Sequence, residues 1–220
     1  MSVSEPWRRQ YRDRFIRDAH QLLAWGYEGS RASIQGADNE EDREEEAITG
    51  YIVQAIRDRL NDSATPERFN AYTPCETSPV NDGSRTGRRR RELDILVQCS
   101  SKRPRWGFVF EAKRLRARIC PIGRYTGRDG LQCFVRGEYA RDHTHAAMVG
   151  YVQSHTPERW IVHLQRSFRD REAQLLTRRE LSPIQIVPEL PHEWLSEHGR
   201  PDGSPICIYH IFLDCCASDG

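Results

Sequence analysis

Two apolar stretches in the middle of the chain flank a short polar one, and this pattern predicts a β-hairpin. The stretches cover residues 92–98 and 106–113, and the Ser-, Lys- and Arg-rich segment between them predicts the hairpin loop. Strand side chains alternate between the two faces of a sheet. We therefore expect Glu111 and Lys113 to share one face of the second strand, beside a first strand that carries Asp94 in an apolar run.

The segments before this hairpin follow a mostly helical pattern. Residues 5–25 place apolar side chains three and four positions apart with arginines between them, which predicts an amphipathic helix before a Gly- and Ser-rich loop at 26–36. Acidic residues 38–46 open a second helix, because negative charge in a first turn complements the helix dipole. We expect a first strand at 66–74 and a mobile loop at 77–91.

After the hairpin, residues 114–129 contain Pro and Gly and predict a connection over the edge of the sheet. The elements expected next are a helix, a central strand, a helix and two short edge strands, at 130–139, 146–152, 156–168, 184–187 and 206–213. The run at 146–152 is apolar throughout, as in a strand that is buried on both faces. Thr156 and Pro157 are favoured residues for a helix cap and first turn.

This order of elements predicts an α/β fold with a central mixed β-sheet flanked by helices. We expect one domain over residues 1–220, with an N-terminal helical extension at 1–30. Residues 41–153 would form the core, and residues 154–220 would add a helix and edge strands. The sequence contains no internal repeat that would indicate a second unit.

The composition fits one domain of this size. The chain has 220 residues, of which 37% are hydrophobic and 30% are charged, so it can bury a core. No apolar run reaches the roughly 18 residues of a transmembrane helix, and the Arg-rich start lacks the apolar centre of a secretory signal. Seven cysteines without a C-x-x-C pair predict reduced thiols and a cytoplasmic protein.

The charges are distributed unevenly along the chain, although the net charge is only +1. Residues 85–128 contain fourteen Lys and Arg but three Asp and Glu, so this block carries +11 and the rest of the chain carries −10. Phosphate backbones attract such a block, although charge runs are also common on ordinary solvated surfaces. The candidate nucleic-acid-binding residues are Arg88, Arg89, Arg90, Arg114 and Arg116.

The acidic residues inside this basic block are Glu92, Asp94 and Glu111. Mg²⁺ prefers oxygen ligands and is often held by one or two carboxylates, so Asp94 and Glu111 are candidate ligands for Mg²⁺, with Mn²⁺ as a substitute. Lys113 would then orient or activate the attacking water, or stabilise charge at phosphorus. The alternative is a solvated strand face with a surface Glu–Lys pair.

The pattern Asp94 … Glu111-Ala112-Lys113, on two strands that follow an acidic helix, resembles the PD-(D/E)XK nuclease superfamily. The resemblance implies a restriction-endonuclease-like fold. One departure is Leu93, which stands where the motif has proline. The motif covers 22 positions, and the order of elements over residues 41–153 fits as well.

The resemblance also implies further site residues. The acidic helix often lends a carboxylate, for which Glu45 is the candidate and Glu46 the rival; a solvent-facing helix cap is the alternative. Gln132 would contact the attacking water or a phosphate, or else be an ordinary surface residue. Independently of the resemblance, the His-x-His pair His143 and His145 just before the central strand is a candidate for a metal or acid/base role, with two incidental histidines in a turn as the alternative.

Taken together, these patterns predict a metal-dependent endonuclease that hydrolyses DNA phosphodiester bonds in restriction, anti-phage defence or repair. RNA is an alternative substrate. A homodimer is a further possibility that the sequence leaves undecided, because many nucleases cut both strands by pairing two such sites. Two other functions stay open. One is a non-catalytic nucleic-acid-binding module on the same fold, and the other is a protein-interaction module that uses its basic face.

Overall fold

The predicted hairpin organises the sheet in the computed structural model, which describes residues 5–79, 92–101 and 105–217. Strand β2 (Glu92–Cys99) pairs with β3 (Trp106–Leu115) in antiparallel register, with Ile95 opposite Phe110. The odd and even residues of β3 face different cores, because Phe108 and Phe110 belong to one hydrophobic cluster and Val109 to the other.

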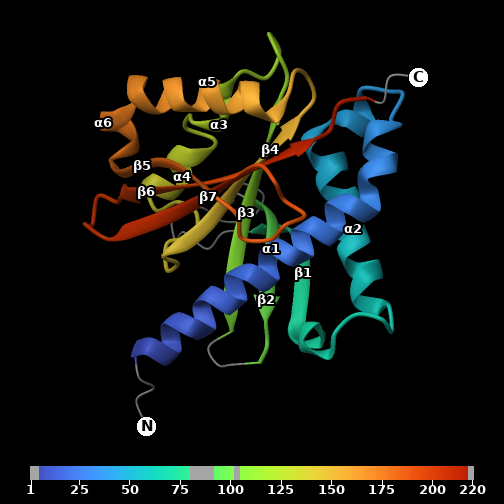
Figure 1. Cartoon of the computed structure of the whole chain (residues 1–220). Helices are drawn as coiled ribbons and strands as arrows, with labels where there is room; N and C mark the ends of the chain where they lie inside the picture. The colour runs from blue at the N-terminus through green and yellow to red at the C-terminus, as the bar shows by residue number, and fades with distance from the viewer. Residues whose placement is uncertain (1–4, 80–91, 102–104, 218–220) are drawn as a thin grey trace.

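Seven strands form one mixed sheet in the order β1-β2-β3-β4-β7-β6-β5 (Figure 1). The other five strands are β1 (Tyr72–Pro79), β4 (His145–Val152), β5 (Thr177–Ile184), β6 (Glu193–Gly199) and β7 (Pro205–Asp214). β4 runs parallel to both β3 and β7, and the remaining neighbours are antiparallel. The predicted class, an α/β domain with a central mixed sheet, is confirmed.

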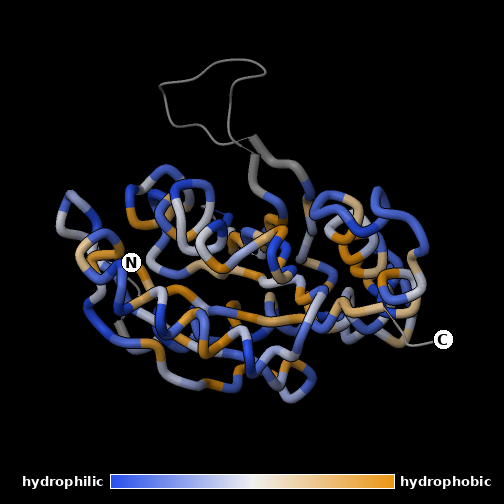
Figure 2. The backbone as a smooth tube through the Cα atoms, turned by 90° about the horizontal axis from the view of Figure 1, so that it is seen from above, coloured by the Kyte–Doolittle hydropathy of each residue, from blue (hydrophilic) through white to orange (hydrophobic). Residues whose placement is uncertain are grey.

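Helices cover both faces of this sheet (Figures 1 and 2). One layer holds α1 (Glu5–Gln35) and α2 (Glu45–Asn61), and the other holds α3 (Ile122–Tyr125), α4 (Leu131–Val135), α5 (Pro157–Asp170) and α6 (Glu172–Leu175). Two short 3₁₀ helices cover Glu41–Arg43 and Glu67–Ala71. Among the described residues, no helix is long and apolar enough to cross a membrane.

The loop predicted at 26–36 is wrong, because α1 continues through it to Gln35. Its glycines serve the contact between α1 and α2. A Cβ at Gly26 would lie 2.6 Å from Ile56 Cγ1, and one at Gly29 would lie 3.2 Å from Ala55 Cβ. A glycine inside a helix costs about 1 kcal/mol. Here the missing glycine side chains allow the two helices to approach closely, so these glycines lie at a helix crossing rather than in a turn.

Several other boundaries differ from the prediction. The first strand begins at Tyr72 rather than at residue 66, because a 3₁₀ helix occupies Glu67–Ala71. The α-helix of the acidic segment begins at Glu45, and the helix expected at 130–139 ends at Val135. The loop expected at 77–91 contributes its first residues to β1, and residues 80–91 lie outside the described part of the chain.

The C-terminal strands also correct the prediction. The strand expected at 184–187 is absent, since β5 ends at Ile184, while β6 lies in a segment that was expected to be a connection. β7 is an interior strand between β4 and β6 rather than an edge strand. The polar sequence of β6 concealed it, because three of its buried residues are Glu193, Ser196 and His198.

These buried polar groups of β6 are bonded to one another and to their neighbours. His198 Nδ1 donates to the Leu175 carbonyl at 2.7 Å, so its Nε2 accepts from the Ser196 hydroxyl at 2.8 Å. Ser196 Oγ also lies 2.8 Å from Nε2 of His210. Burial lowers the pKa of His198 to about 4 and that of His210 well below its ordinary value. Both rings are therefore neutral in the fold.

We predict that His198→Gln lowers the free energy of unfolding more at pH 7 than at pH 5, by on the order of 2 kcal/mol. The pKa of His198 lies below its unfolded value of 6.5. The unfolded chain therefore binds a proton that the folded chain does not, and the stabilisation is complete above about pH 6.5 and is lost towards pH 4. Urea denaturation at both pH values measures the difference, and an equal cost at both would contradict it.

Candidate active site

The candidate site lies where β2 and β3 separate. Their backbone pairing ends at Ile95 and Phe110, and carboxylates then accept from the free amides of β3. The N–H of Ala112 donates to Asp94 Oδ2 at 2.7 Å, and the N–H of Arg114 donates to Oε2 of Glu45 at 3.0 Å. Side-chain carboxylates thus replace the carbonyls of a neighbouring strand, which fixes Asp94 and the first residue of α2 beside β3.

The ammonium of Lys113 lies among the carboxylates at the point where β2 and β3 separate. Its Nζ donates to Oε1 of Glu45 at 2.8 Å, to Oε1 of Glu111 at 2.9 Å and to the carbonyl of Ala112. Oδ2 of Asp94 lies 3.9 Å away. One cation therefore contacts three carboxylates that come from α2, β2 and β3. The predicted grouping of Asp94, Glu111 and Lys113 on one face is present, and Glu45 joins it.

Burial sets the protonation of these groups. It raises the pKa of Glu111 well above its ordinary value, and the Asp94 carboxylate raises it further. Burial also raises the pKa of Asp94 to about 6, against the lowering effect of the Lys113 ammonium. Burial lowers the pKa of Lys113, but Glu111, Asp94 and Glu45 outweigh it and leave that pKa above its ordinary value. Lys113 is therefore held as a cation.

A cavity of about 440 Å³ opens beside this group. It is lined by Glu45, Glu46, Thr49, Glu76, Asp94, Glu111, Lys113, Arg124, Asp129 and Tyr139. Six of these residues are carboxylates and two are cations, so the cavity is strongly negative and attracts positive ions.

The donor set fits a hard divalent cation. Glu111 is 3% exposed; its Oε2 accepts no hydrogen bond from the described residues, and its carboxyl group is hydrogen-bonded to that of Asp94. Asp94 and Glu111 would together offer the one or two carboxylates with which proteins often hold Mg²⁺. Within the described ranges, no group of three or more His, Cys, Asp and Glu side chains is arranged to hold a metal.

The other predicted residues differ in position. Glu46 lines the cavity, but Glu45 is the residue that bonds Lys113. Gln132 does not line the cavity: its amide contacts Gln174 at 3.4 Å and Arg136 at 3.2 Å.

The two histidines also lie away from the cavity. His143 is next to Gly107, near the loop end of the hairpin, and His145 begins β4, where its ring stacks on Tyr209. Burial lowers the pKa of both histidines, that of His145 to about 4.

The candidate phosphate-binding arginines have partners of their own. Arg114 NH2 lies 2.7 Å from Oε2 of Glu44, and Arg116 NH1 lies 2.7 Å from Oε1 of Glu40. The side chain of Arg114 is only 11% exposed. These ion pairs attach the acidic segment before α2 to the end of β3. Arg88, Arg89 and Arg90 lie outside the described residues.

The sequence predicts that arginines of the 85–91 and 114–128 segments bind flanking phosphates, but it does not single out Arg124 or Asp129. Arg124 and Asp129 line the main cavity and also a neighbouring cavity of about 180 Å³, whose lining further includes Lys113, Gly123, Gly127 and Arg128. The Gly-rich composition of this connection and its position after Lys113 predicted a segment over the edge of the sheet. No spacing in it singled out Arg124.

The chain matches no protein-family model, no curated protein and no solved structure.

We predict that Lys113→Met lowers the free energy of unfolding by about 3–5 kcal/mol at pH 7, because it leaves buried carboxylates uncompensated. Adding Glu111→Gln should restore part of this loss, by about 1–2 kcal/mol, because glutamine cannot ionise and needs no compensating cation. Chemical denaturation of the single and double variants measures both effects.

Arg124→Met is the matched control, because it removes an exposed cation from the same cavity and should cost under about 1 kcal/mol. A Lys113→Met variant that is as stable as this control would contradict the prediction. So would a double variant less stable than Lys113→Met alone.

Proposed function

We propose that this protein is a metal-dependent endonuclease of the PD-(D/E)XK type that hydrolyses phosphodiester bonds of DNA. The observation that carries the proposal is the convergence of Asp94, Glu111 and Lys113 in one cavity that is rich in carboxylates. The restriction-endonuclease-like character of the fold is part of the proposal. It is supported by the motif residues on two adjacent strands of a mixed sheet.

Each residue has a defined role in this proposal. Asp94 and Glu111 would hold one Mg²⁺ or Mn²⁺, which when bound supplies a Lewis acid that neutralises charge on the phosphate. Lys113 is a donor, and all three of its N–H groups have acceptors in the protein. A phosphate oxygen or the attacking water would replace one of those acceptors, so that the ammonium orients the water or stabilises charge at phosphorus.

Glu45 and Arg124 both line the cavity and have supporting roles in this proposal. Glu45 bonds both the Lys113 ammonium and the Arg114 amide, so it positions the ammonium relative to the strand. Arg124 also lines the cavity and would bind a phosphate oxygen, because a guanidinium is a planar donor suited to phosphate.

Several finer points belong to the same proposal. RNA is the alternative substrate, because the same groups can act on its phosphodiester bonds. Cutting both strands of a duplex would need two such sites, which a homodimer would supply. The odd number of cysteines and their spacing support a cytoplasmic setting. The proposal covers restriction, anti-phage defence and repair alike.

The test is cleavage of supercoiled plasmid, linear DNA and RNA by the purified protein with Mg²⁺, Mn²⁺ or EDTA. We expect cleavage with either metal and none with EDTA. Asp94→Ala and Lys113→Ala should each lower the rate by at least about 10²–10³, because each removes charge stabilisation at the reacting phosphate. Assays well below the melting temperature of each variant separate this loss from unfolding.

Gln132→Ala is the matched control, because Gln132 lies outside the cavity, and it should cut within about twofold of wild type. Cleavage that persists in EDTA, or in both Asp94→Ala and Lys113→Ala, would contradict the proposal. Salt-sensitive DNA binding without cleavage under any of these conditions would identify a non-catalytic binding module.

A further inference from the structure

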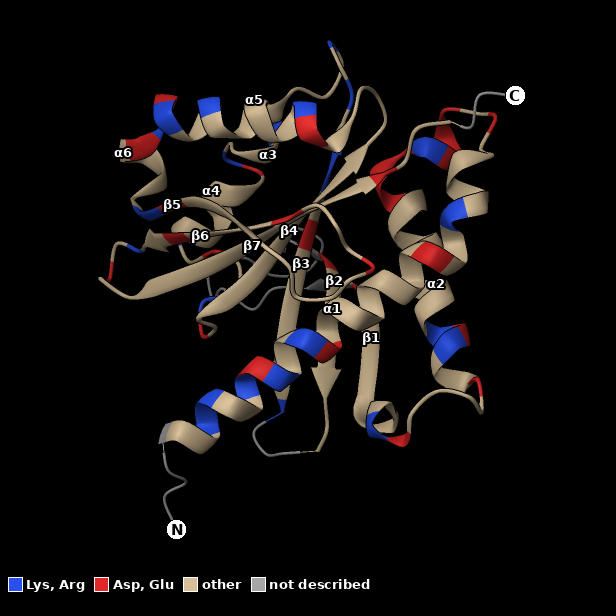
Figure 3. Cartoon of the chain, viewed as in Figure 1, with Lys and Arg blue, Asp and Glu red and all other residues tan. Residues whose placement is uncertain are grey.

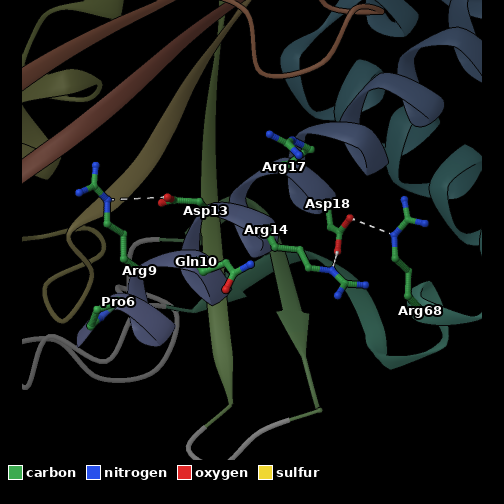
Figure 4. A pocket seen from close by; sticks show the side chains of 8 residues that line it. All are labelled: Pro6, Arg9, Gln10, Asp13, Arg14, Arg17, Asp18 and Arg68. Atoms are coloured by element: carbon green, nitrogen blue, oxygen red, sulfur yellow. Dashed lines mark hydrogen bonds and ion pairs between the residues drawn. The ribbon is translucent and has the colours of Figure 1, made fainter. Parts of the chain in front are cut away.

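A second and larger hollow, of about 840 Å³, lies along the N-terminal half of α1. It is lined by Pro6, Arg9, Gln10, Asp13, Arg14, Arg17, Asp18 and Arg68 (Figure 4). We call this surface the α1 groove. Four of its residues are arginines and two are aspartates, and the basic residues of α1 are concentrated in this half of the helix (Figure 3).

A buried carboxylate organises the arginines of the α1 groove. Asp18 is 4% exposed and accepts from the hydroxyl of Tyr72 at 2.8 Å and from Nε of Arg68 at 3.2 Å. Nε of Arg14 lies 3.9 Å from the same carboxylate (Figure 4). The guanidinium of Arg68 also lies 4.4 Å from the ring centre of Phe69. Arg68 is therefore oriented before any ligand binds, which lowers the entropy lost on binding.

The remaining arginines are available to a ligand. Arg17 makes no ion pair among the described residues, and Figure 4 shows it without a dashed contact. The pair between Arg9 and Asp13 is 4.0 Å long, and its side chains are 76% and 57% exposed. Such a solvated pair is weak and exchanges easily for another anion. The terminal nitrogens of Arg68 have no hydrogen bond within the described residues.

The chemistry of the lining favours a polymer of phosphates. Protein interfaces usually contain aromatic or aliphatic anchors at their centre, whereas Pro6 is the single apolar residue among those that line this groove. Guanidinium groups bind phosphate oxygens in pairs of parallel hydrogen bonds. Arg9 and Arg17 are about 12 Å apart along the helix, which matches three to four nucleotides of one strand at about 3.4 Å each.

We propose that the α1 groove binds the sugar–phosphate backbone of nucleic acid outside the catalytic cavity. This inference rests on the proposed function, since it names the same polymer as the partner. The groove lies near the loop end of the hairpin, where Tyr11 contacts Ser101 at 2.7 Å. Asp94 and Cys99 are about 17 Å apart along β2. The two sites are therefore separate, and changes in the groove leave the carboxylates intact.

The test is binding of a fluorescently labelled 30-base-pair duplex in EDTA, over a range of salt concentrations. We expect the triple variant Arg14→Gln, Arg17→Gln, Arg68→Gln to bind at least about tenfold more weakly. The slope of log affinity against log salt should fall by about two to three, because each lost phosphate contact removes about 0.9 from it. The matched control is Arg159→Gln, Arg166→Gln, Arg169→Gln, which removes three exposed arginines from α5.

The control should bind within about twofold of wild type, since its arginines lie on another helix. Equal weakening of duplex binding by both triple variants would show that the effect comes from net charge alone, and it would overturn the proposal. Wild-type affinity of the groove variant for the duplex would overturn it as well. Arg17→Glu keeps the test decisive if the triple variant unfolds, because no ion pair of Arg17 is lost; it should weaken binding about threefold or more.

These measurements distinguish a failure of the α1-groove proposal from a failure of the nuclease proposal. Weakened duplex binding by a protein that cuts nothing would support the groove and reject the hydrolase. Metal-dependent cutting by a protein whose groove variant binds DNA normally would reject the groove alone. Loss of polyglutamate binding in the groove variant, with duplex binding unchanged, would assign the surface to an acidic protein and overturn the proposal.

Discussion

The arrangement on which the rest of the site depends is the single ammonium of Lys113 among three carboxylates. These carboxylates belong to α2, β2 and β3, so the cluster forms only when the start of α2 lies against the end of the hairpin. Buried like charges repel strongly unless a cation lies between them. Lys113 supplies that cation, and the splayed end of β2 and β3 supplies the backbone amides that hold Asp94 and Glu45.

The same physics explains the surroundings of the site. Glu40 and Glu44 bond Arg116 and Arg114 just beyond Lys113, so the acidic segment before α2 is fixed to β3 by successive ion pairs. The cavity itself stays negative, while the exposed arginines gather along α1. In the proposed account, the negative region binds a metal ion and the positive region binds the polymer, and the two charges are kept apart on one molecule.

The sequence was sufficient for the parts of the fold that follow simple periodicity. Strand alternation predicted that Glu111 and Lys113 share a face, and the apolar runs located the hairpin and β4. It failed where tertiary contact overrides local preference. Gly26 lies within α1 because α2 crosses there. The strand β6 was missed because Ser196 and His198 are buried but bonded internally.

Charge patterns give only part of the arrangement. The basic block predicts phosphate binding, but it does not show that Arg114 and Arg116 pair with Glu40, which lies about 70 residues earlier in the sequence. Long-range pairing of this kind has no periodic signal. The position of Gln132 likewise depends on where α4 ends and packs, which local sequence does not determine.

The most direct test of the central claim is calorimetric titration of Mn²⁺ into the protein without nucleic acid. The account predicts that wild type binds the metal and that Asp94→Asn and Glu111→Gln each weaken binding at least about tenfold. Glu46→Gln, which alters a carboxylate that lines the same cavity without bonding Lys113, should bind as wild type does. Absence of metal binding by wild type, or equal binding by Glu111→Gln, would contradict the account.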